Sequence, residues 1–473
     1  MRLRTKSVLI TLTAAAIALL ILASCGGGNH SSTFGGQATG TINTSLSDPA
    51  TCTPPNGNFS HVFVTVVDVK AHTNANAGDN DSGFMDLTPN LHNSPVQVDL
   101  LGAASAGCFL AQLGSGTVIP AGTYQQIRII LLDNNANTTV ANNQCNGSFN
   151  CVVLASNGSV HPLLLSSEAT TGIKIPSGQI GGGGVTVPPN QTADLNIDFN
   201  ACQSIVLQPN GQFRLKPVLH AGEVSLSASN SVSGTVVDSV THAPISGGMV
   251  IVALEQKDSN NVDRVVMETM AGSNGGFSFC PVVAGTYDVV AVAISGNIQY
   301  AATVTTGVQP GNQLGNVPLI AQAGASAQIT GQVNTAGASG GISADVAVSA
   351  LQMVGSTLMT IPAGQTINSA VQLASVNTFT TQASGTCAAS SDCATYTLLL
   401  PAANPNVGAF LSTGTTYSQA APPVNYSMDG QAFTVGSSAG TPDCTQADVQ
   451  VSVPSAVSGA NPASPAINFT GCT

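Results

Sequence analysis

Short stretches in which apolar and polar residues alternate recur along this chain, and clusters of Asn, Gly and Pro separate them. The stretch from His61 to Lys70 places Val62, Val64 and Val66 on one face, because successive side chains of a β-strand point to opposite faces. Charged residues make up only 7% of the chain, and the long runs of Glu, Lys and Leu typical of surface helices are missing. The sequence therefore predicts an all-β protein of many short strands joined by tight turns.

The first residues have the order of a secretory signal. Three basic residues precede an apolar run that ends at Leu22, and small residues then lead to Cys25. This ending resembles the lipobox of bacterial lipoproteins. The resemblance implies a signal peptide of residues 1–24, diacylglycerol on the sulfur of Cys25 and a further acyl chain, such as palmitate, on its new amino group.

The alternative for this segment is an uncleaved membrane anchor. The apolar run has about 15 residues, whereas a spanning helix needs roughly 20. Residues 25–37 are rich in Gly and Ser and are expected to form a flexible tether. Gly26, rather than Asp, follows the cysteine, and this resembles lipoproteins that are sent on to the outer membrane. We therefore expect an exported protein held by lipid on the periplasmic or surface face.

Basic residues are scarce, and this excludes several partners. Three of the ten Lys and Arg lie in the signal segment, which leaves seven against 22 acidic residues. Arg264 is the last basic residue of the chain. Nucleic-acid binding and docking on anionic lipid both require a basic surface, so neither is expected. The N-terminal lipid should be the membrane contact.

Eleven cysteines include Cys25, so ten remain for the exported part. An even number in an oxidising compartment predicts disulfides. A zinc site is the alternative, but the chain has no Cys-x-x-Cys and no His at zinc-ligand spacing from a cysteine. Sequence alone leaves four cysteines unpaired: Cys52, Cys108, Cys202 and Cys280. Spacing suggests three pairs: Cys145 with Cys151, Cys387 with Cys393, and Cys444 with Cys472.

Residues 38–224 contain a series of strand motifs in a recognisable order. The motifs are Ser47-Asp48-Pro49, Val98-Asp99-Leu100-Leu101, the turn from Ile119 to Tyr124, Thr171-Gly172-Ile173-Lys174-Ile175, Asp198-Phe199 and Leu215-Lys216-Pro217-Val218. Together they resemble the bacterial domain of unknown function 4382, which occurs in exported lipoproteins. The resemblance implies a location and a β architecture, but no chemistry.

A second unit covers residues 231–320. Its motifs are Val232-Ser233-Gly234-Thr235-Val236, Asn274-Gly275-Gly276-Phe277-Ser278-Phe279 and Ala284-Gly285-Thr286-Tyr287. They resemble the carboxypeptidase regulatory-like domain, which implies a seven-stranded transthyretin-like sandwich with Phe277 and Phe279 in the core. Residues 328–473 are β-rich and resemble no family, although Ile329-Thr330-Gly331-Gln332-Val333 echoes the start of the second unit. The expected architecture is a series of β-sandwich domains, transthyretin-like or immunoglobulin-like.

Two Gly-x-Ser-x-Gly sequences, at residues 337–341 and 436–440, are candidate nucleophile elbows. Such an elbow needs a strand before the serine and a helix after it. No histidine follows His242, so either serine would need a base from another part of the chain. Turns are the better interpretation of both sequences, and no catalytic residue is predicted.

Histidines and aspartates of the first unit could frame a metal site, but none has the i, i+4 spacing of a helical zinc pair. Solvated loops are the preferred interpretation, and no metal or other cofactor is predicted. Residues 77–83 offer oxygen atoms at alternate positions, as calcium loops do, but lack the bidentate Glu that completes them. The candidates considered were His61, His72, His92, Asp79, Asp81 and Asp86.

The function that these observations favour is that of a non-catalytic, lipid-anchored protein of the cell envelope. A binding module for carbohydrate or other envelope material is the first hypothesis, a structural or adhesive surface protein the second, and a hydrolase the least favoured. Trp is absent, so sugar stacking would depend on Tyr or on loop amides. The Tyr candidates are Tyr300, Tyr396, Tyr417 and Tyr426.

Overall fold

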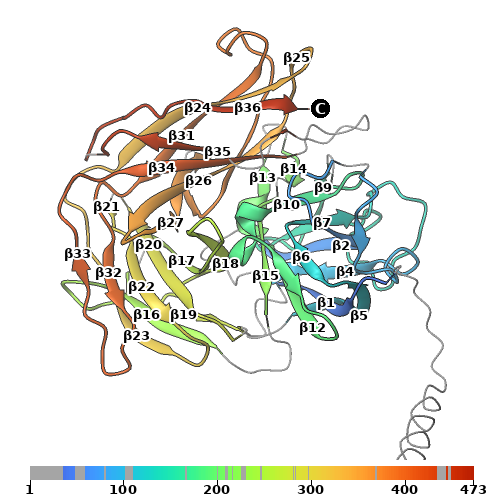
Figure 1. Cartoon of the computed structure of the whole chain (residues 1–473), viewed down its shortest axis with the longest axis horizontal. Coiled ribbons are helices and arrows are strands. Elements are labelled where there is room, and N and C mark those ends of the chain that lie inside the picture. Colours follow the sequence, from blue (N-terminus) through green and yellow to red (C-terminus); the bar gives the residue numbers. More distant parts are fainter. Residues whose placement is uncertain are drawn as a thin grey trace, which may run out of the picture. The chain divides into compact units, whose positions relative to one another are not determined.

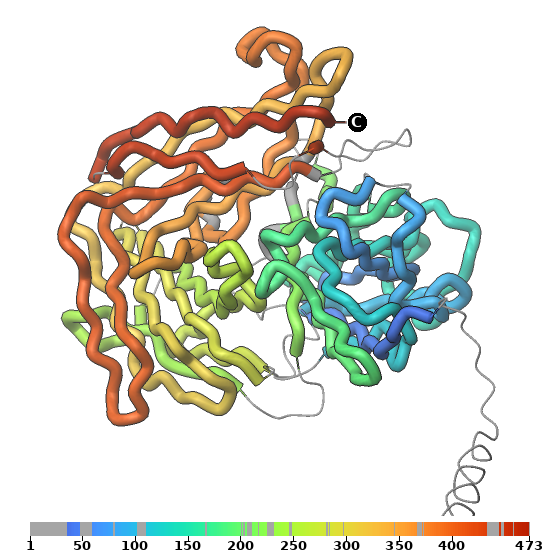
Figure 2. Tube along the Cα trace, in the orientation of Figure 1, coloured from blue at the N-terminus to red at the C-terminus, as the bar shows by residue number. Residues whose placement is uncertain are grey.

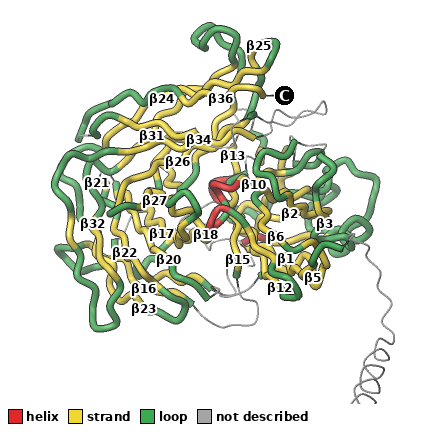
Figure 3. The backbone as a smooth tube through the Cα atoms, in the orientation of Figure 1, coloured by secondary structure: helices red, strands yellow, loops and turns green. Residues whose placement is uncertain are grey.

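A computed structural model shows a fold made almost entirely of strands and loops, with a few helical turns (Figure 3). The all-β prediction is confirmed. The structure describes residues 36–47, 59–78, 81–101, 110–165, 168–199, 201–207, 211–215, 217–224, 231–245, 248–280, 282, 284–296, 298–367, 370–433, 444–445, 449–456 and 458–472. Residues 1–24, Cys25, Cys52, Cys108, Asp79 and residues 436–440 lie outside this part of the chain.

Two main sheets form from residues 39–223, drawn from blue to green in Figure 2. The first has the order β15-β12-β1-β5, and the second follows the path β10-β7-β2-β8-β9-β14-β13, with β3 and β4 also paired to β2. Members of the first sheet are β1 (Thr39–Ser47), β5 (Ala111–Pro120), β12 (Thr192–Phe199) and β15 (Leu219–Glu223). Members of the second sheet are β2 (Phe59–His72), β3 (Met85–Asp86), β4 (Val96–Asp99), β7 (Gln126–Leu131), β8 (Cys151–Leu154), β9 (Val160–Leu164), β10 (Ile173–Pro176), β13 (Ile205–Leu207) and β14 (Phe213–Leu215).

Smaller elements complete this region. β6 (Gly122–Tyr124) pairs with β11 (Val185–Val187). The helical turns are η1 (Ser177–Gln179), η2 (Gly181–Gly183) and α2 (Ala201–Ser204).

The buried face predicted for β2 is confirmed, but its buried apolar positions change from even to odd residue numbers after Val66. Val62, Val64 and Val66 are completely buried and contribute to the core. A bulge between Val66 and Asp68 then shifts the register of β2 against β7. A bulge adds a residue to one strand and re-aims the side chains beside it. The buried apolar positions of β2 therefore continue at Val69 and Ala71, not at residues 68 and 70.

Strands of residues 232–319 pack as two layers. A three-stranded sheet, β19-β16-β23, supplies one layer, and neighbouring strands of a twelve-stranded sheet supply the other. Phe277 and Phe279 are both buried in the core of this region, as predicted, with ring centroids 5.9 Å apart. The strands are β16 (Val232–Asp238), β17 (Gly248–Lys257), β18 (Val262–Met270), β19 (Gly276–Phe279), β20 (Tyr287–Ser295), β21 (Ile298–Gln299), β22 (Thr303–Val308) and β23 (Gln313–Leu319).

The twelve-stranded sheet does not stop at residue 320. Its path is β33-β32-β22-β20-β17-β18-β27-β26-β34-β35, so strands from residues 328–473 flank those of residues 231–320 on both sides. Figure 1 shows β32 beside β22, and their pairing is parallel. The strands that join are β26 (Asp345–Val354), β27 (Thr357–Ile361), β30 (Asn377–Thr380), β32 (Asn406–Ala409), β33 (Ser418–Gln419), β34 (Tyr426–Phe433) and β35 (Val449–Val453).

A six-stranded sheet completes the C-terminal region. It has the order β25-β24-β31-β28-β29, and β36 pairs with β24. Its apolar residues and those of the facing strands share one core. Its strands are β24 (Ala327–Gly337), β25 (Gly340–Gly341), β28 (Ala363–Ile367), β29 (Ala370–Ala374), β31 (Asp392–Leu400) and β36 (Ile467–Cys472).

Candidate functional site

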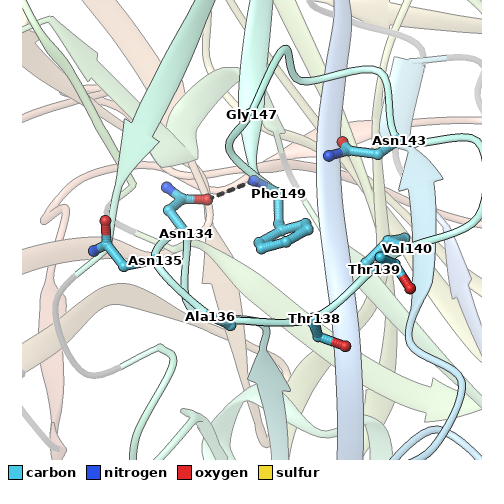
Figure 4. A pocket seen from close by; sticks show the side chains of 9 residues that line it. All are labelled: Asn134, Asn135, Ala136, Thr138, Thr139, Val140, Asn143, Gly147 and Phe149. Atoms are coloured by element: carbon cyan, nitrogen blue, oxygen red, sulfur yellow. Dashed lines mark hydrogen bonds between the residues drawn. The ribbon is translucent and has the colours of Figure 1, made fainter.

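A cavity of about 540 Å³ lies on the connection between β7 and β8 (Figure 4). All of its lining residues are uncharged, and most carry an amide or a hydroxyl group. Figure 4 shows the ring of Phe149 in the space that the other residues surround. The lining residues are Asn134, Asn135, Ala136, Thr138, Thr139, Val140, Asn143, Gly147 and Phe149.

Two asparagines hold the walls of the cavity in place. The Asn134 side-chain oxygen accepts hydrogen bonds from the backbone N–H groups of Phe149 and Asn150, at 3.0 and 2.8 Å. The Asn143 oxygen accepts from the Gln97 side chain at 2.9 Å and from the Cys145 N–H at 3.0 Å. These amides already have partners, so they shape the cavity and leave ligand contacts to their neighbours.

A disulfide between Cys145 and Cys151, with an S–S distance of 1.98 Å, closes the loop that carries Gly147 and Phe149 of the lining. Within this loop Asn146 has a φ of 47°, a left-handed conformation that Asn tolerates better than most residues. The bond ties the loop to the first residue of β8. The loop is therefore pre-organised before any ligand arrives.

Three exposed side chains of the lining are available to a ligand. Asn135, Thr138 and Thr139 are exposed, and within the described chain their side chains make no hydrogen bond. Phe149 lies beneath them with only 7% of its surface exposed, so its ring serves as an apolar floor. This combination offers neutral hydrogen-bonding groups over an apolar surface.

The sequence signal for this cavity was weak, because its residues resemble an ordinary polar loop. The tyrosines proposed for sugar stacking are mostly unsuited to it. Tyr300, Tyr396 and Tyr426 are buried, and the Tyr426 hydroxyl donates to the Pro401 carbonyl at 2.8 Å. Tyr417 is half-buried, with its hydroxyl 2.8 Å from that of Thr305.

The histidines considered as metal ligands lie apart, each beside a different aspartate. His61 Nδ1 lies 2.7 Å from Asp99, and His72 Nε2 lies 3.2 Å from Asp81. Asp81 also accepts a hydrogen bond from the Gly83 N–H, which lowers its pKa. A joint metal site of these histidines, which the sequence did not favour, is not formed among the described residues.

His92 has a different environment, which the sequence did not reveal. Its Nε2 lies 2.9 Å from Asp86 and 3.8 Å from Asp68, and these three residues bring their ligand atoms within 4.8 Å of one another. Asp68 follows the bulge of β2 and was not among the sequence candidates. A bulge leaves no clear mark in the alternation of residues, so no sequence signal pointed to Asp68.

Two basic residues of the N-terminal region lie on separate strands. Lys174 belongs to β10 and is buried, whereas Arg214 belongs to β14. β10 pairs with β7 and β14 with β9 and β13.

A group of carboxylic acids is buried where β12, β17 and β18 pack. Asp198 accepts hydrogen bonds from the Ser47 hydroxyl at 3.0 Å and from the Glu268 N–H at 3.1 Å, yet burial raises its pKa to about 7. Burial and the neighbouring Asp288 raise the pKa of Asp263 to about 8. Burial also raises the pKa of Glu255 well above its ordinary value.

Arg264 neutralises two other buried acids. Its Nε donates to Asp258 at 3.1 Å and its Nη1 to Asp429 at 2.7 Å. The side chains of Arg264 and Asp429 are each 3% exposed. This ion pair links β18 to β34, and residue 264 is the last cation of the chain.

The remaining cysteine pairs suggested by spacing are also bonded. Cys387 pairs with Cys393, and Cys444 pairs with Cys472, at S–S distances of 2.10 and 1.96 Å. Cys280 is disulfide-bonded as well.

Of the two candidate elbows, the described one is a hairpin turn. Ser339 lies between β24 and β25, where Gly337 pairs with Gly340. Directly after this serine comes β25, where an elbow would require a helix.

Three of the solved structures with some likeness to this chain are bacterial proteins, and two of these are pilins. The Bacillus anthracis TIE protein has 10% identity and a TM-score of 0.15, over 92% of this chain and 50% of its own. The minor pilin GBS52 of Streptococcus agalactiae has 11% identity and a TM-score of 0.18, over 51% of this chain and 96% of its own. A streptococcal ancillary pilin has 10% identity and a TM-score of 0.18, over 90% of this chain and 99% of its own. TM-scores this low carry no information about the function of this protein.

The chain spans about half the length of the Bacillus anthracis protein. No curated protein matches the chain. Residues 39–217 match the family model described as domain of unknown function DUF4382, which confirms for this part of the chain the resemblance drawn from its sequence motifs.

Proposed function

We propose that this protein is a non-catalytic, lipid-anchored protein of the cell envelope whose N-terminal β domain binds carbohydrate. The cavity between β7 and β8 is the observation that carries this proposal. Its lining has no charged residue, which suits a neutral ligand rich in hydroxyl groups. Ligand sites typically combine an apolar surface with a few well-placed polar groups. Phe149 and the three free side chains above it have that composition.

A glycan array followed by affinity measurement tests this proposal. Replacing Thr138 and Thr139 together with alanine should weaken binding of the best glycan roughly thirtyfold, because two hydrogen bonds worth about 1 kcal/mol each are lost. Ser156→Ala is the matched control, since Ser156 is an exposed hydroxyl of the same domain outside the cavity. The control should bind like the wild type.

Two results would contradict carbohydrate binding. One is equal affinity of the wild type and the Thr138/Thr139 variant for the glycan. The other is a screen that finds no glycan while pull-down from envelope extracts recovers only proteins. The second result would favour the alternative, a structural or adhesive surface protein.

The lipid anchor gives a separate prediction. No helix in the described ranges is long and apolar enough to cross a membrane. Cys25→Ala should block lipidation and release most of the exported protein into the soluble fraction, because acyl chains hold it through about 0.8 kcal/mol per buried methylene. Cell fractionation and mass spectrometry of the N-terminus measure both effects. Ser24→Ala, which keeps a small residue before the cysteine, should stay anchored. Equally firm membrane attachment of the Cys25→Ala protein would contradict this anchor.

A further inference from the structure

We infer that Asp68, Asp86 and His92 form a binding site for a divalent transition-metal ion. Their ligand atoms lie within 4.8 Å of one another. Atoms held at about 2.0–2.2 Å around a tetrahedral ion are roughly 3.3–3.6 Å apart. The distances from His92 Nε2 to Asp86 and Asp68, 2.9 and 3.8 Å, bracket that value. Small side-chain rotations would therefore complete the coordination.

The burial of Asp68 distinguishes this cluster from an ordinary group of polar side chains at the surface. Its side chain is only 2% exposed, its Oδ1 has no hydrogen-bond partner, and its Oδ2 has an ion pair with Lys70 at 3.1 Å. Buried carboxylates are normally hydrogen-bonded or bound to metal, because an unsatisfied one costs several kcal/mol. Asp68 lies beside the bulge, and its carboxylate faces His92. A buried carboxylate thus lies next to a half-buried ligand, Asp86, and an exposed one, His92.

In the absence of metal, the ammonium group of Lys70 is paired with the Asp68 carboxylate. Its Nζ lies 3.1 Å from Asp68 Oδ2, and its side chain is 37% exposed. A flexible, partly exposed lysine can move away into solvent when an ion binds. Lys70 should therefore compete with the metal, and its removal should tighten metal binding.

The other ligands are held ready by the backbone. Asp86 Oδ1 accepts a hydrogen bond from the Thr88 N–H at 2.8 Å, which leaves Oδ2 facing His92. The Thr88 hydroxyl accepts from the Val69 N–H at 2.8 Å, which ties this turn to β2. Two carboxylates with one imidazole suit Zn²⁺ and its neighbours better than Ca²⁺ or Mg²⁺, which prefer oxygen ligands alone. A bound ion would join β2, β3 and the following turn.

Titration of the metal-free, full-length protein with ZnCl₂ tests this inference, by calorimetry and by the shift in Tm. One Zn²⁺ should bind and raise the Tm. His92→Gln and Asp86→Asn should each weaken binding by about tenfold or more, and Lys70→Gln should strengthen it. Co²⁺ should give the visible absorption bands of a tetrahedral site in the wild type and not in His92→Gln.

His61→Gln is the matched control. His61 also contacts an aspartate, at 2.7 Å, and is about as exposed as His92, but it belongs to no three-residue cluster in the described chain. This variant should bind Zn²⁺ like the wild type. Equal Zn²⁺ affinity of His92→Gln and the wild type would overturn the site. An equal rise in Tm with Ca²⁺ or Mg²⁺ would overturn the assignment to transition metals.

Discussion

Arg264→Met should destabilise the folded protein by about 3–5 kcal/mol, the cost of removing one partner of a buried ion pair. Arg264 donates to Asp258 and Asp429, and the variant leaves both carboxylates buried without their cation. Methionine retains much of the side-chain volume, so loss of packing contributes little. Urea unfolding followed by circular dichroism should show a lower midpoint with an unchanged slope.

Two further variants separate charge from general damage. Lys257→Met removes the same charge from an exposed position two residues beyond Glu255, and it should change stability by no more than about 0.5 kcal/mol. Adding Asp429→Asn to the Arg264→Met protein should recover part of the loss, because one buried charge disappears. An unchanged unfolding midpoint in Arg264→Met would show that this ion pair does not stabilise the fold.

Local patterns were sufficient to predict much of this architecture. Alternation identified the buried face of Val62 to Val66, and the Gly-rich turn before Phe277 and Phe279 marked two core positions. Three disulfides could be paired because the cysteines of each pair are near in sequence. These features depend on residues close together along the chain.

Pairing between distant strands could not be predicted in this way. The parallel pairs of β18 with β27 and of β22 with β32 continue one sheet across residue 320. Alternation shows which face of a strand is buried, but it does not identify the strand beside it. The sequence therefore suggested separate units where the structure has a shared sheet.

The candidate sites were harder to predict for the same reason. Alternation places Asp68 on the same apolar face as Val62, Val64 and Val66, and the bulge in β2 removes it from that face. Asn134 and Asn143 read as loop residues, yet their amides build a cavity through contacts with Phe149 and Gln97. Charged residues are seldom fully buried, so no pattern in the sequence predicted buried acids beside Arg264.

Three buried acids with raised pKa values, Asp198, Asp263 and Glu255, should make the protein less stable as the pH rises. Asp198 has a folded pKa of about 7 against an ordinary value of 3.8. Its contribution to stability is therefore complete below the unfolded pKa and is lost as the pH rises through about 7. Asp263 acts in the same way up to about pH 8, and the raised pKa of Glu255 adds to both. We expect the free energy of unfolding to decrease from about pH 5 to about pH 8.

His220 has the opposite effect on the pH dependence of stability, but its single proton is fewer than the three protons of the acids. Burial lowers its pKa from 6.5 to about 4, so its contribution is present above the unfolded pKa and is lost as the pH falls through about 4. Between these values the folded state keeps protons on the three acids while the unfolded state gains one on the histidine. The net effect still favours the folded state at lower pH.

Asp198→Asn isolates the contribution of one of these acids without adding charge. Asparagine resembles the protonated carboxyl group, so the variant should lose the part of the pH dependence that lies between about pH 4 and about pH 7. Because one pKa unit corresponds to about 1.4 kcal/mol, the shift from 3.8 to about 7 should amount to roughly 4 kcal/mol. Urea unfolding at a series of pH values measures it, with the exposed Asp133→Asn as the control that should follow the wild type. Parallel pH profiles of Asp198→Asn and the wild type would mean that Asp198 is already ionised in the folded protein, and that its hydrogen bonds to Ser47 and Glu268 outweigh its burial.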